Sequence, residues 1–253
     1  MPTVKINGRS AHVTWPPGML PSEEVSGKSP WQQILGFKPF EDYCEGMDHG
    51  LVVRSIDIPA VTMFGSRIGF MFINADIVRA DDGSPVPGAA FLRGGTVIIL
   101  VILRCEGQEY VVIVRQPRSP VGSIAFAETP AGMLDGSGKF AGKAAQELKE
   151  ELGLEIREED LIDMTKLVFS TSVRGIYASA GGSDEFGRFM LYRRDVTSEE
   201  LASFKSRKTG AVGESERIVT DVIPLQDLWT TSPSSGTFTA LYLYGRLDLT
   251  GLL

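Results

Sequence analysis

Cysteine is scarce in this sequence of 253 residues, which contains only Cys44 and Cys105. Neither cysteine belongs to a Cys-x-x-Cys pair or to another spacing typical of zinc ligands. Two cysteines are also too few for a disulfide framework. The sequence therefore predicts two inert, reduced thiols in an intracellular protein.

Long apolar runs are missing as well. The longest, such as TVIILVIL at 96–103, are far too short to cross a bilayer as a helix. The first residues, MPTVKINGRSAHVTWPPGML, contain neither the apolar stretch of a signal peptide nor an Arg- and Ser-rich transit pattern. A cytoplasmic location is therefore the expectation.

Positive charge is in deficit, since 25 Lys and Arg stand against 32 Asp and Glu, for a net charge of −7. This balance argues against nucleic acid or an anionic membrane as the main partner. An enzyme of this charge that acts on phosphates needs metal ions or local arginines to receive its small-molecule substrate. The hydrophobic share of 43% is that of an ordinary soluble globular protein.

The segment AGMLDGSGKFAGKAAQELKEELGL at 131–154 carries the strongest functional signal. Its second half is rich in helix formers, and Glu147, Glu150 and Glu151 have the spacing that puts them on one face of one helical turn. Like charges so close together disfavour a helix, and a hard divalent cation that prefers oxygen ligands would offset their repulsion. A solvated acidic helix face is the alternative interpretation.

The spacing of this segment resembles the Nudix box, G-x5-E-x7-R-E-U-x-E-E-x-G-U, in which U is an aliphatic residue. Two positions depart from the box, because its early glutamate is Gly138 here and its arginine is Gln146. That arginine normally holds the glutamate cluster in place, whereas a glutamine can donate hydrogen bonds but brings no charge. The remaining positions match without a gap: Gly132, Glu147, Leu148, Glu150, Glu151, Gly153 and Leu154.

Further segments narrow the resemblance to the ADP-sugar pyrophosphatases of this family, which act on ADP-ribose and ADP-glucose. The stretch VRQPRSPVGSIAFAETPAGMLD at 114–135 is similar to the sequence before their box, and MFGSRIGFMFINADI and VPGAAFLRGG are similar to the region preceding it. SAGGSDE at 179–185 resembles their SPGGxxE segment, with Ala180 in place of the proline. The resemblance implies Mg²⁺-dependent hydrolysis of a diphosphate bond to AMP and a sugar phosphate.

The resemblance also implies roles for the acidic residues. The backbone carbonyl of Ala131 and the carboxylates of Glu147 and Glu151 would hold Mg²⁺, with Mn²⁺ as the alternative ion. Glu150 would ligate or support a second ion. The loop GAVGESERIVTDV at 210–222 resembles the one that supplies the general base in this subfamily. Glu214 would be the base and Glu216 a further metal ligand, and the alternative is a solvated surface loop.

Substrate contacts are expected from residues outside the box helix. Arg118 resembles the arginine that meets the diphosphate or the terminal sugar, and Glu128 would accept hydrogen bonds from sugar hydroxyls or cap a turn. Glu185 is a lesser candidate for a contact with the metals, the water or the substrate. An adenine platform is expected as well, and Phe64 or Phe70 would supply it, unless both are core residues.

Periodicity predicts an α/β fold. We expect a Nudix α/β/α sandwich with a mixed sheet, preceded by a small N-terminal antiparallel β subdomain. The predicted divisions are an extension with short helices at 1–50, a dimerising β subdomain at 51–93 and the Nudix domain at 94–253. The detailed pattern predicts a short strand at 3–6 or 11–15, a helix starting at Ser29-Pro30, a strand within 157–171, a capped helix from about Thr197 and a terminal helix at 238–249.

Two other functions stay open. One is a Nudix hydrolase for NADH, coenzyme A or a dinucleoside polyphosphate. The box is not followed by an SQPWPFPxS-like segment, which argues against NADH. The other is a catalytically weak Nudix-fold protein that only binds nucleotides, suggested by Gly138 and Gln146. The three retained box glutamates argue against it. A homodimer is expected from the resemblance.

Overall fold

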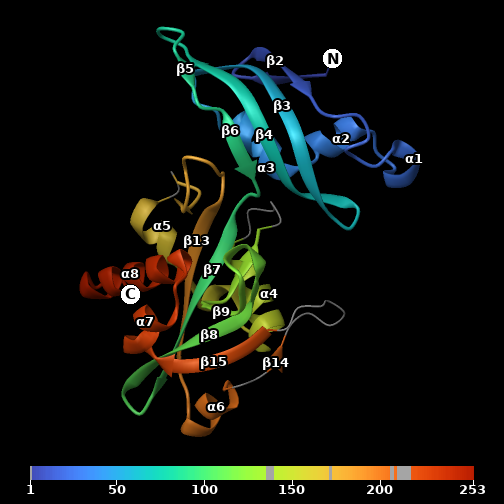
Figure 1. Cartoon of the computed structure of the whole chain (residues 1–253). Helices are drawn as coiled ribbons and strands as arrows, with labels where there is room; N and C mark the ends of the chain where they lie inside the picture. Colours follow the sequence, from blue (N-terminus) through green and yellow to red (C-terminus); the bar gives the residue numbers. More distant parts are fainter. Residues whose placement is uncertain (1, 135–139, 171–172, 206–207, 210–217) are drawn as a thin grey trace. The chain divides into compact units, whose positions relative to one another are not determined.

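The computed structural model describes residues 2–134, 140–170, 173–205, 208–209 and 218–253, which form two compact units (Figure 1). The N-terminal unit comprises residues 1–94 with 179–185, and the C-terminal unit comprises 95–178 with 186–253. None of the helices in the described ranges is both long and apolar enough to span a membrane.

The N-terminal unit consists of one mixed sheet and three short helices over its described residues. Its sheet has the order β1-β2-β3-β4-β5, with β6 also paired to β4. Its elements are β1 (Thr3–Ile6), β2 (Arg9–Thr14), α1 (Glu23–Ser26), α2 (Pro30–Leu35), α3 (Lys38–Glu45), β3 (Leu51–Phe64), β4 (Arg67–Arg79), β5 (Pro85–Val86) and β6 (Ala89–Leu92).

The strands of 51–92 pair antiparallel, as predicted, but the sheet as a whole is mixed because β2 lies parallel to β3. A hairpin starts the chain, since β1 and β2 pair through the turn at Asn7-Gly8, where both residues have positive φ angles of 50° and 78°. Asn-Gly is the dipeptide that suits such a two-residue turn. Both of the alternative strands expected at 3–6 and 11–15 are therefore present.

Residues 2–50 share one hydrophobic core with the strands that follow them. The predicted helix start at Ser29 is confirmed, because its hydroxyl accepts from the backbone N–H of Gln32 in a capping box. This cap directs Ile34 inward, and both Ile34 and Phe40 are fully buried against residues of β3 and β4. The helices at 30–45 thus pack against the sheet that contains β3 and β4.

The C-terminal unit contains a mixed sheet in the order β11-β13-β7-β8-β15-β14, with β9, β10 and β12 paired to β8, β7 and β13. Its strands are β7 (Thr96–Cys105), β8 (Gln108–Arg118), β9 (Ser123–Glu128), β10 (Ala131–Met133), β11 (Leu161–Asp163), β12 (Ile176–Tyr177), β13 (Phe186–Asp195), β14 (Lys208–Thr209) and β15 (Ile218–Pro224). Its helices are α4 (Phe140–Leu152), α5 (Met164–Phe169), α6 (Ser198–Ser203), α7 (Leu228–Thr231) and α8 (Ser235–Leu249), with short 3-10 turns at Ser119–Val121, Glu158–Asp160 and Leu225–Asp227.

This sheet is the centre of an α/β/α sandwich, which confirms the predicted fold class. Alternate residues of β7 point to opposite faces. Val97, Ile99, Val101 and Leu103 lie in the cluster that includes α4, whereas Leu100 and Ile102 lie in the cluster that includes α8. Figure 1 shows α4 on one side of the sheet and α5, α7 and α8 on the other. A sheet covered on both faces explains why the β7 sequence is apolar throughout.

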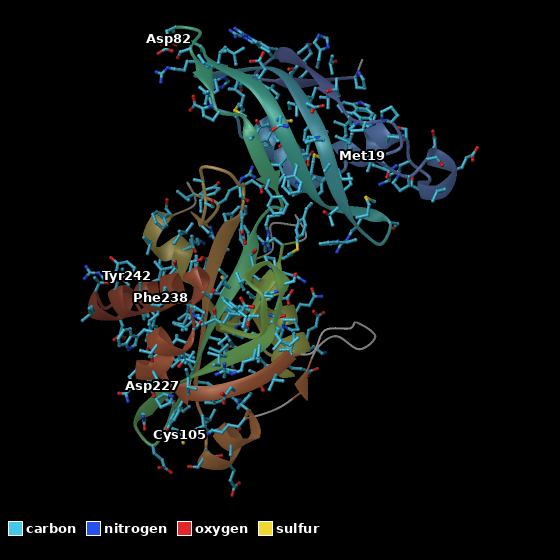
Figure 2. All side chains as sticks on the ribbon, in the orientation of Figure 1. Met19, Asp82, Cys105, Asp227, Phe238 and Tyr242 are labelled. Carbon is cyan, nitrogen blue, oxygen red and sulfur yellow. The ribbon has the colours of Figure 1, made fainter. Side chains whose placement is uncertain are left out.

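The terminal helix follows the prediction. Helix α8 buries Ala240, Leu243 and Leu247 against the sheet. Phe238 and Tyr242, labelled in Figure 2, lie on its exposed side. The thiols of Cys44 and Cys105 are free and buried.

Helix α5 was not expected. The pattern predicts a strand within 157–171, but only Leu161–Asp163 is a strand, and a helix begins at Met164. The side chain of Asp163 accepts from the backbone N–H of Lys166, which caps this helix. A single Asp before an apolar run is too weak a signal to separate a helix start from a continuing strand.

Asp163 also forms a buried ion pair. Arg188 of β13, of which only 5% is exposed, donates through Nε and Nη2 to Asp163 Oδ2 at 2.9 and 2.6 Å. Its Nη1 donates to the carbonyls of Val173 and Arg174, and its guanidinium carbon lies 4.7 Å from the centre of the Phe140 ring. The pair therefore ties together β13, α5 and the start of α4.

Removing one partner should leave a buried, unpaired charge. We expect Arg188→Met to lower the free energy of unfolding by about 3–5 kcal/mol, measured by urea denaturation. Arg157→Met is the control, because Arg157 pairs with Asp160 at the surface, and it should leave the denaturation midpoint unchanged. Equal midpoints for Arg188→Met and the wild type would show that the buried pair does not hold these elements together.

Candidate active site

Helix α4 turns two of its glutamates inward. Ala144, Leu148 and Leu152 form an apolar stripe at intervals of four residues and pack in the core beneath the sheet. The same orientation buries Glu147 and Glu151, which are 8% and 5% exposed.

Glu150 lies on the exposed side of α4, although the spacing predicts one face for all three glutamates. Its Oε1 accepts a hydrogen bond from Gln146 Nε2 at 2.8 Å. The structure thus brings Glu147 and Glu151 together and separates Glu150 from them. Residues at i+3 and i+4 point in directions that differ by one residue's rotation about the helix axis. The apolar stripe of α4 faces the core, so Glu151 at i+4 is buried and Glu150 at i+3 is not.

The end of α4 explains two further positions of the box. Gly153 has a φ of +67°, in the left-handed region that suits glycine. Its N–H bonds to the carbonyl of Lys149, and the Leu154 N–H bonds to the carbonyl of Leu148. Leu154 then packs on the core cluster of α4. This arrangement ends the helix at Leu152 and fixes the turn that carries Glu151.

Gly132 allows the Glu147 carboxylate to reach the backbone of β10. A methyl group at position 132 would lie 1.9 Å from Glu147 Cδ. No side chain fits at that distance, so only glycine lets the carboxylate lie against the strand. The glycine at the first position of the box is therefore required for the packing of Glu147.

A lysine neutralises Glu147. Lys143 Nζ lies 2.7 Å from Glu147 Oε1, and the two side chains are only 16% and 11% exposed. Sequence reasoning missed Lys143, although its i, i+4 spacing to Glu147 was a usable signal.

Glu151 is the most strongly perturbed carboxylate of the site. Burial raises its pKa well above the ordinary value, and the charges of Glu147 and Glu128 raise it further. Arg118 and a hydrogen bond from the Ala131 backbone N–H oppose these effects. Its Oε2 atom is buried and has no hydrogen-bond partner among the described residues. A buried carboxylate oxygen without a partner is costly and suggests a ligand that would engage it.

Glu128 anchors Arg118. Its Oε1 accepts from Arg118 Nε at 2.8 Å and Arg118 Nη2 at 2.7 Å, and from Gln116 Nε2 at 3.2 Å. Burial raises the pKa of Glu128, and the positive charge of Arg118 partly opposes this. The expected contact of Glu128 with a sugar stays a prediction, while its observed role is to hold a guanidinium that is 41% exposed. Gln116 was not foreseen as part of this cluster.

These residues fit a divalent cation. Glu147 and Glu151 are buried carboxylates, one of them with an unpartnered oxygen. A bound cation would favour the charged form of Glu151 and so oppose the effect of burial on its pKa. Within the described ranges no three Asp, Glu, His or Cys side chains converge as a complete metal site. The expected set also includes the Ala131 carbonyl and Glu216, and Glu216 lies outside the described residues.

Two predicted site residues, Glu214 and Glu216, lie outside the described residues, and so does Gly138, the position of the early box glutamate. Glu185 belongs to the N-terminal unit, where its Oε1 lies 3.3 Å from Arg93 Nη1.

The two phenylalanines considered for adenine belong to an aromatic cluster of the N-terminal unit. Phe64 and Phe70 meet edge to face at 4.9 Å between ring centres, and Phe70 contacts Phe91 at 5.1 Å. Phe64 is 38% exposed. The cluster therefore combines internal packing with an exposed edge, and its binding role stays a prediction.

Comparison with known proteins decides the family. The chain is 35% identical over 207 residues to Nudix hydrolase 14, chloroplastic, of Arabidopsis thaliana, and the match covers 81% of this chain and 67% of that protein. The chain belongs to the Nudix hydrolase family. No family model matches the chain. The segment that resembles the Nudix box, with the buried glutamates of α4, therefore belongs to a member of this family.

One solved structure supports the fold of this Nudix hydrolase. The crystal structure of an ADP compounds hydrolase superposes with a TM-score of 0.56 at 13% identity, over 82% of this chain and 99% of that one. An Ap4A hydrolase of C. elegans gives a TM-score of only 0.41 at 14% identity, over 62% of this chain and 98% of that one.

The raised pKa of Glu151 predicts a pH-dependent stability. The folded protein holds this proton more tightly than the unfolded chain, whose glutamate titrates near 4.5. The stability linked to Glu151 is therefore fully present below about pH 4.5 and is lost as the pH rises toward the folded pKa. Without metal, Glu151→Gln should melt at the same temperature as the wild type near that pH, and at a higher temperature near pH 8.

Calorimetry in EDTA over this pH range measures the difference. Glu150→Gln is the control, because it removes an exposed carboxylate from the same turn, and its melting temperature should follow the wild type at every pH. A wild-type protein as stable as Glu151→Gln near pH 8 would contradict the burial of an ionisable Glu151.

Proposed function

We propose that this Nudix hydrolase cleaves the diphosphate bond of ADP-sugars, such as ADP-ribose or ADP-glucose, to AMP and a sugar phosphate in a Mg²⁺-dependent reaction. The observation that carries this proposal is Arg118, which is held by Glu128 close enough to Glu151 for its charge to lower the pKa of that residue. An arginine beside buried carboxylates suits a diphosphate, which needs both a guanidinium and a metal-binding group. The fold shared with an ADP compounds hydrolase supports an adenosine diphosphate derivative.

Each residue has a defined task in this proposal. Glu147 and Glu151 would hold the metal with the Ala131 carbonyl, and the exposed Glu150 would support a second ion. When bound, Mg²⁺ would neutralise the phosphates and lower the pKa of a bound water. The exposed part of the Arg118 guanidinium would bind phosphate oxygens, and Glu128 would keep it in that orientation.

The reaction requires a base. A water oxygen attacks one phosphorus, the water proton goes to the base, and the bridging P–O bond breaks with its electron pair on the departing phosphate. We assign the base to Glu214 and a further ligand to Glu216, on the resemblance of their loop to that of the ADP-sugar pyrophosphatases. Glu185 or a glutamate of the box is the next candidate for the base.

A substrate panel tests the proposed activity. With Mg²⁺, we expect ADP-ribose or ADP-glucose to be hydrolysed with a kcat/KM at least about tenfold above NADH, coenzyme A and diadenosine tetraphosphate, which corresponds to about 1.4 kcal/mol of discrimination. Chromatography should detect AMP as the adenine product. Glu151→Gln should lower turnover by orders of magnitude. Glu155→Gln, at an exposed residue paired with Lys149, is the matched control and should retain activity. A preference for another compound would show that the substrate is not an ADP-sugar. No hydrolysis of any compound would favour a protein that only binds nucleotides.

The base and the metal ligands should separate in a Mg²⁺ titration. Glu214→Gln should lower turnover by about 10²–10⁴-fold at every Mg²⁺ concentration, because proton transfer is lost while the ligands remain. Glu151→Gln should in addition require more Mg²⁺. If Glu214→Gln recovers its rate at high Mg²⁺, then Glu214 is a ligand, and if it keeps the full rate the base lies elsewhere.

We also propose that the protein is a homodimer in which the strands of 51–93 take part. This assignment rests on the resemblance to pyrophosphatases that complete their sites in this way. Light scattering at micromolar concentration should return twice the chain mass of 27.5 kDa, and a mass equal to one chain would contradict it.

A further inference from the structure

The arginine that precedes the first glutamate of the R-E-U-x-E-E segment of the Nudix box is Gln146 in this chain, so Glu147 lacks its usual arginine partner. Gln146 does not replace that arginine, because it is exposed and its amide binds Glu150. A buried carboxylate without a cation would be costly. The cation in this structure comes from Lys143, one turn earlier in α4.

The geometry of Lys143 is unusual for a helix lysine. Both partners of the pair are less than one fifth exposed, whereas the Lys149–Glu155 pair near the end of the same helix is 64% and 77% exposed. A lysine that precedes a glutamate by four residues is the less favourable order for an isolated helix. Helix propensity therefore does not account for this pair, and the tertiary environment of Glu147 does.

Two contacts hold the Glu147 carboxylate. Lys143 Nζ engages Oε1 at 2.7 Å. The carboxylate also packs against Gly132, where any added Cβ would overlap Cδ. Together these contacts fix the position of the carboxylate beside β10.

We propose that Lys143 is a positioning residue that takes over the task of the missing box arginine and holds the Glu147 carboxylate in the orientation that the metal requires. This inference rests on the proposed function of the site. Lys143, at a position that the box does not specify, thus supplies the positive charge that Gln146 lacks. This explains how a box without its arginine can keep its glutamate cluster in place.

The consequence concerns metal affinity. A carboxylate that is held in one orientation is a better ligand than one that is free to rotate. Loss of an orienting partner typically weakens metal binding or activity by about 10–100-fold. Lysine and arginine both supply a cation at this distance, so an arginine at 143 should preserve the effect, whereas methionine keeps the length of the stem but not the charge.

The experiment is a Mn²⁺ titration of the full chain, followed by electron paramagnetic resonance without substrate. We expect Lys143→Met to weaken Mn²⁺ binding by about 10–100-fold and Lys143→Arg to remain close to the wild type. Lys149→Met is the matched control at an exposed lysine of the same helix and should bind as the wild type does. Lys143→Gln is the second variant, in case Lys143→Met does not fold.

Kinetics add a readout that a merely structural role would not move. Lys143→Met should raise the Mg²⁺ requirement and lower kcat while KM for ADP-ribose stays nearly constant. Unchanged Mn²⁺ affinity in Lys143→Met or Lys143→Gln would overturn the inference. Tighter binding would overturn it too, because Lys143 would then compete with the metal for Glu147.

The two proposals fail separately. If the wild type does not hydrolyse ADP-sugars but Lys143→Met weakens Mn²⁺ binding, only the substrate is wrong. If the wild type hydrolyses them and Lys143→Met binds Mn²⁺ as the wild type does, only the role of Lys143 is wrong.

Discussion

The burial of two carboxylates on one helix is the constraint on which the site depends. Glu147 and Glu151 lie beneath the sheet because the leucines of α4 must face the core. Each carboxylate then needs compensation: Lys143 serves Glu147, and the Ala131 backbone and the charge of Arg118 partly serve Glu151. One oxygen of Glu151 stays without a described partner. A site of this kind stores an electrostatic cost that a cation would relieve.

The scaffold makes this cost tolerable. Strand β7 is covered on both faces, so the C-terminal unit has two hydrophobic clusters and a rigid central sheet. Strand β10 pairs with β7 and brings Gly132 against Glu147.

Charged pairs divide into two classes in this protein. The pairs Arg188–Asp163 and Lys143–Glu147 are largely buried. The first joins β13 to the start of α5, and the second fixes one carboxylate within helix α4. Pairs such as Arg157–Asp160 lie in water, where screening and side-chain entropy leave them little effect. Buried pairs restrict the orientation of their side chains more than exposed pairs do. The burial of a charged side chain is therefore a better guide to its role than the identity of its partner.

The sequence by itself determined the sandwich fold and the box helix, because periodicity and capping act over a few residues. The helix start at Ser29-Pro30, the capped helix from about Thr197 and the terminal helix at 238–249 are all local signals that the structure confirms. Only the tertiary structure decided that Glu150 faces solvent, that a helix follows Asp163, and that Lys143 neutralises Glu147. These outcomes depend on which face of a helix meets the core and on how much water reaches each charge. Both are set by contacts between segments far apart in the chain.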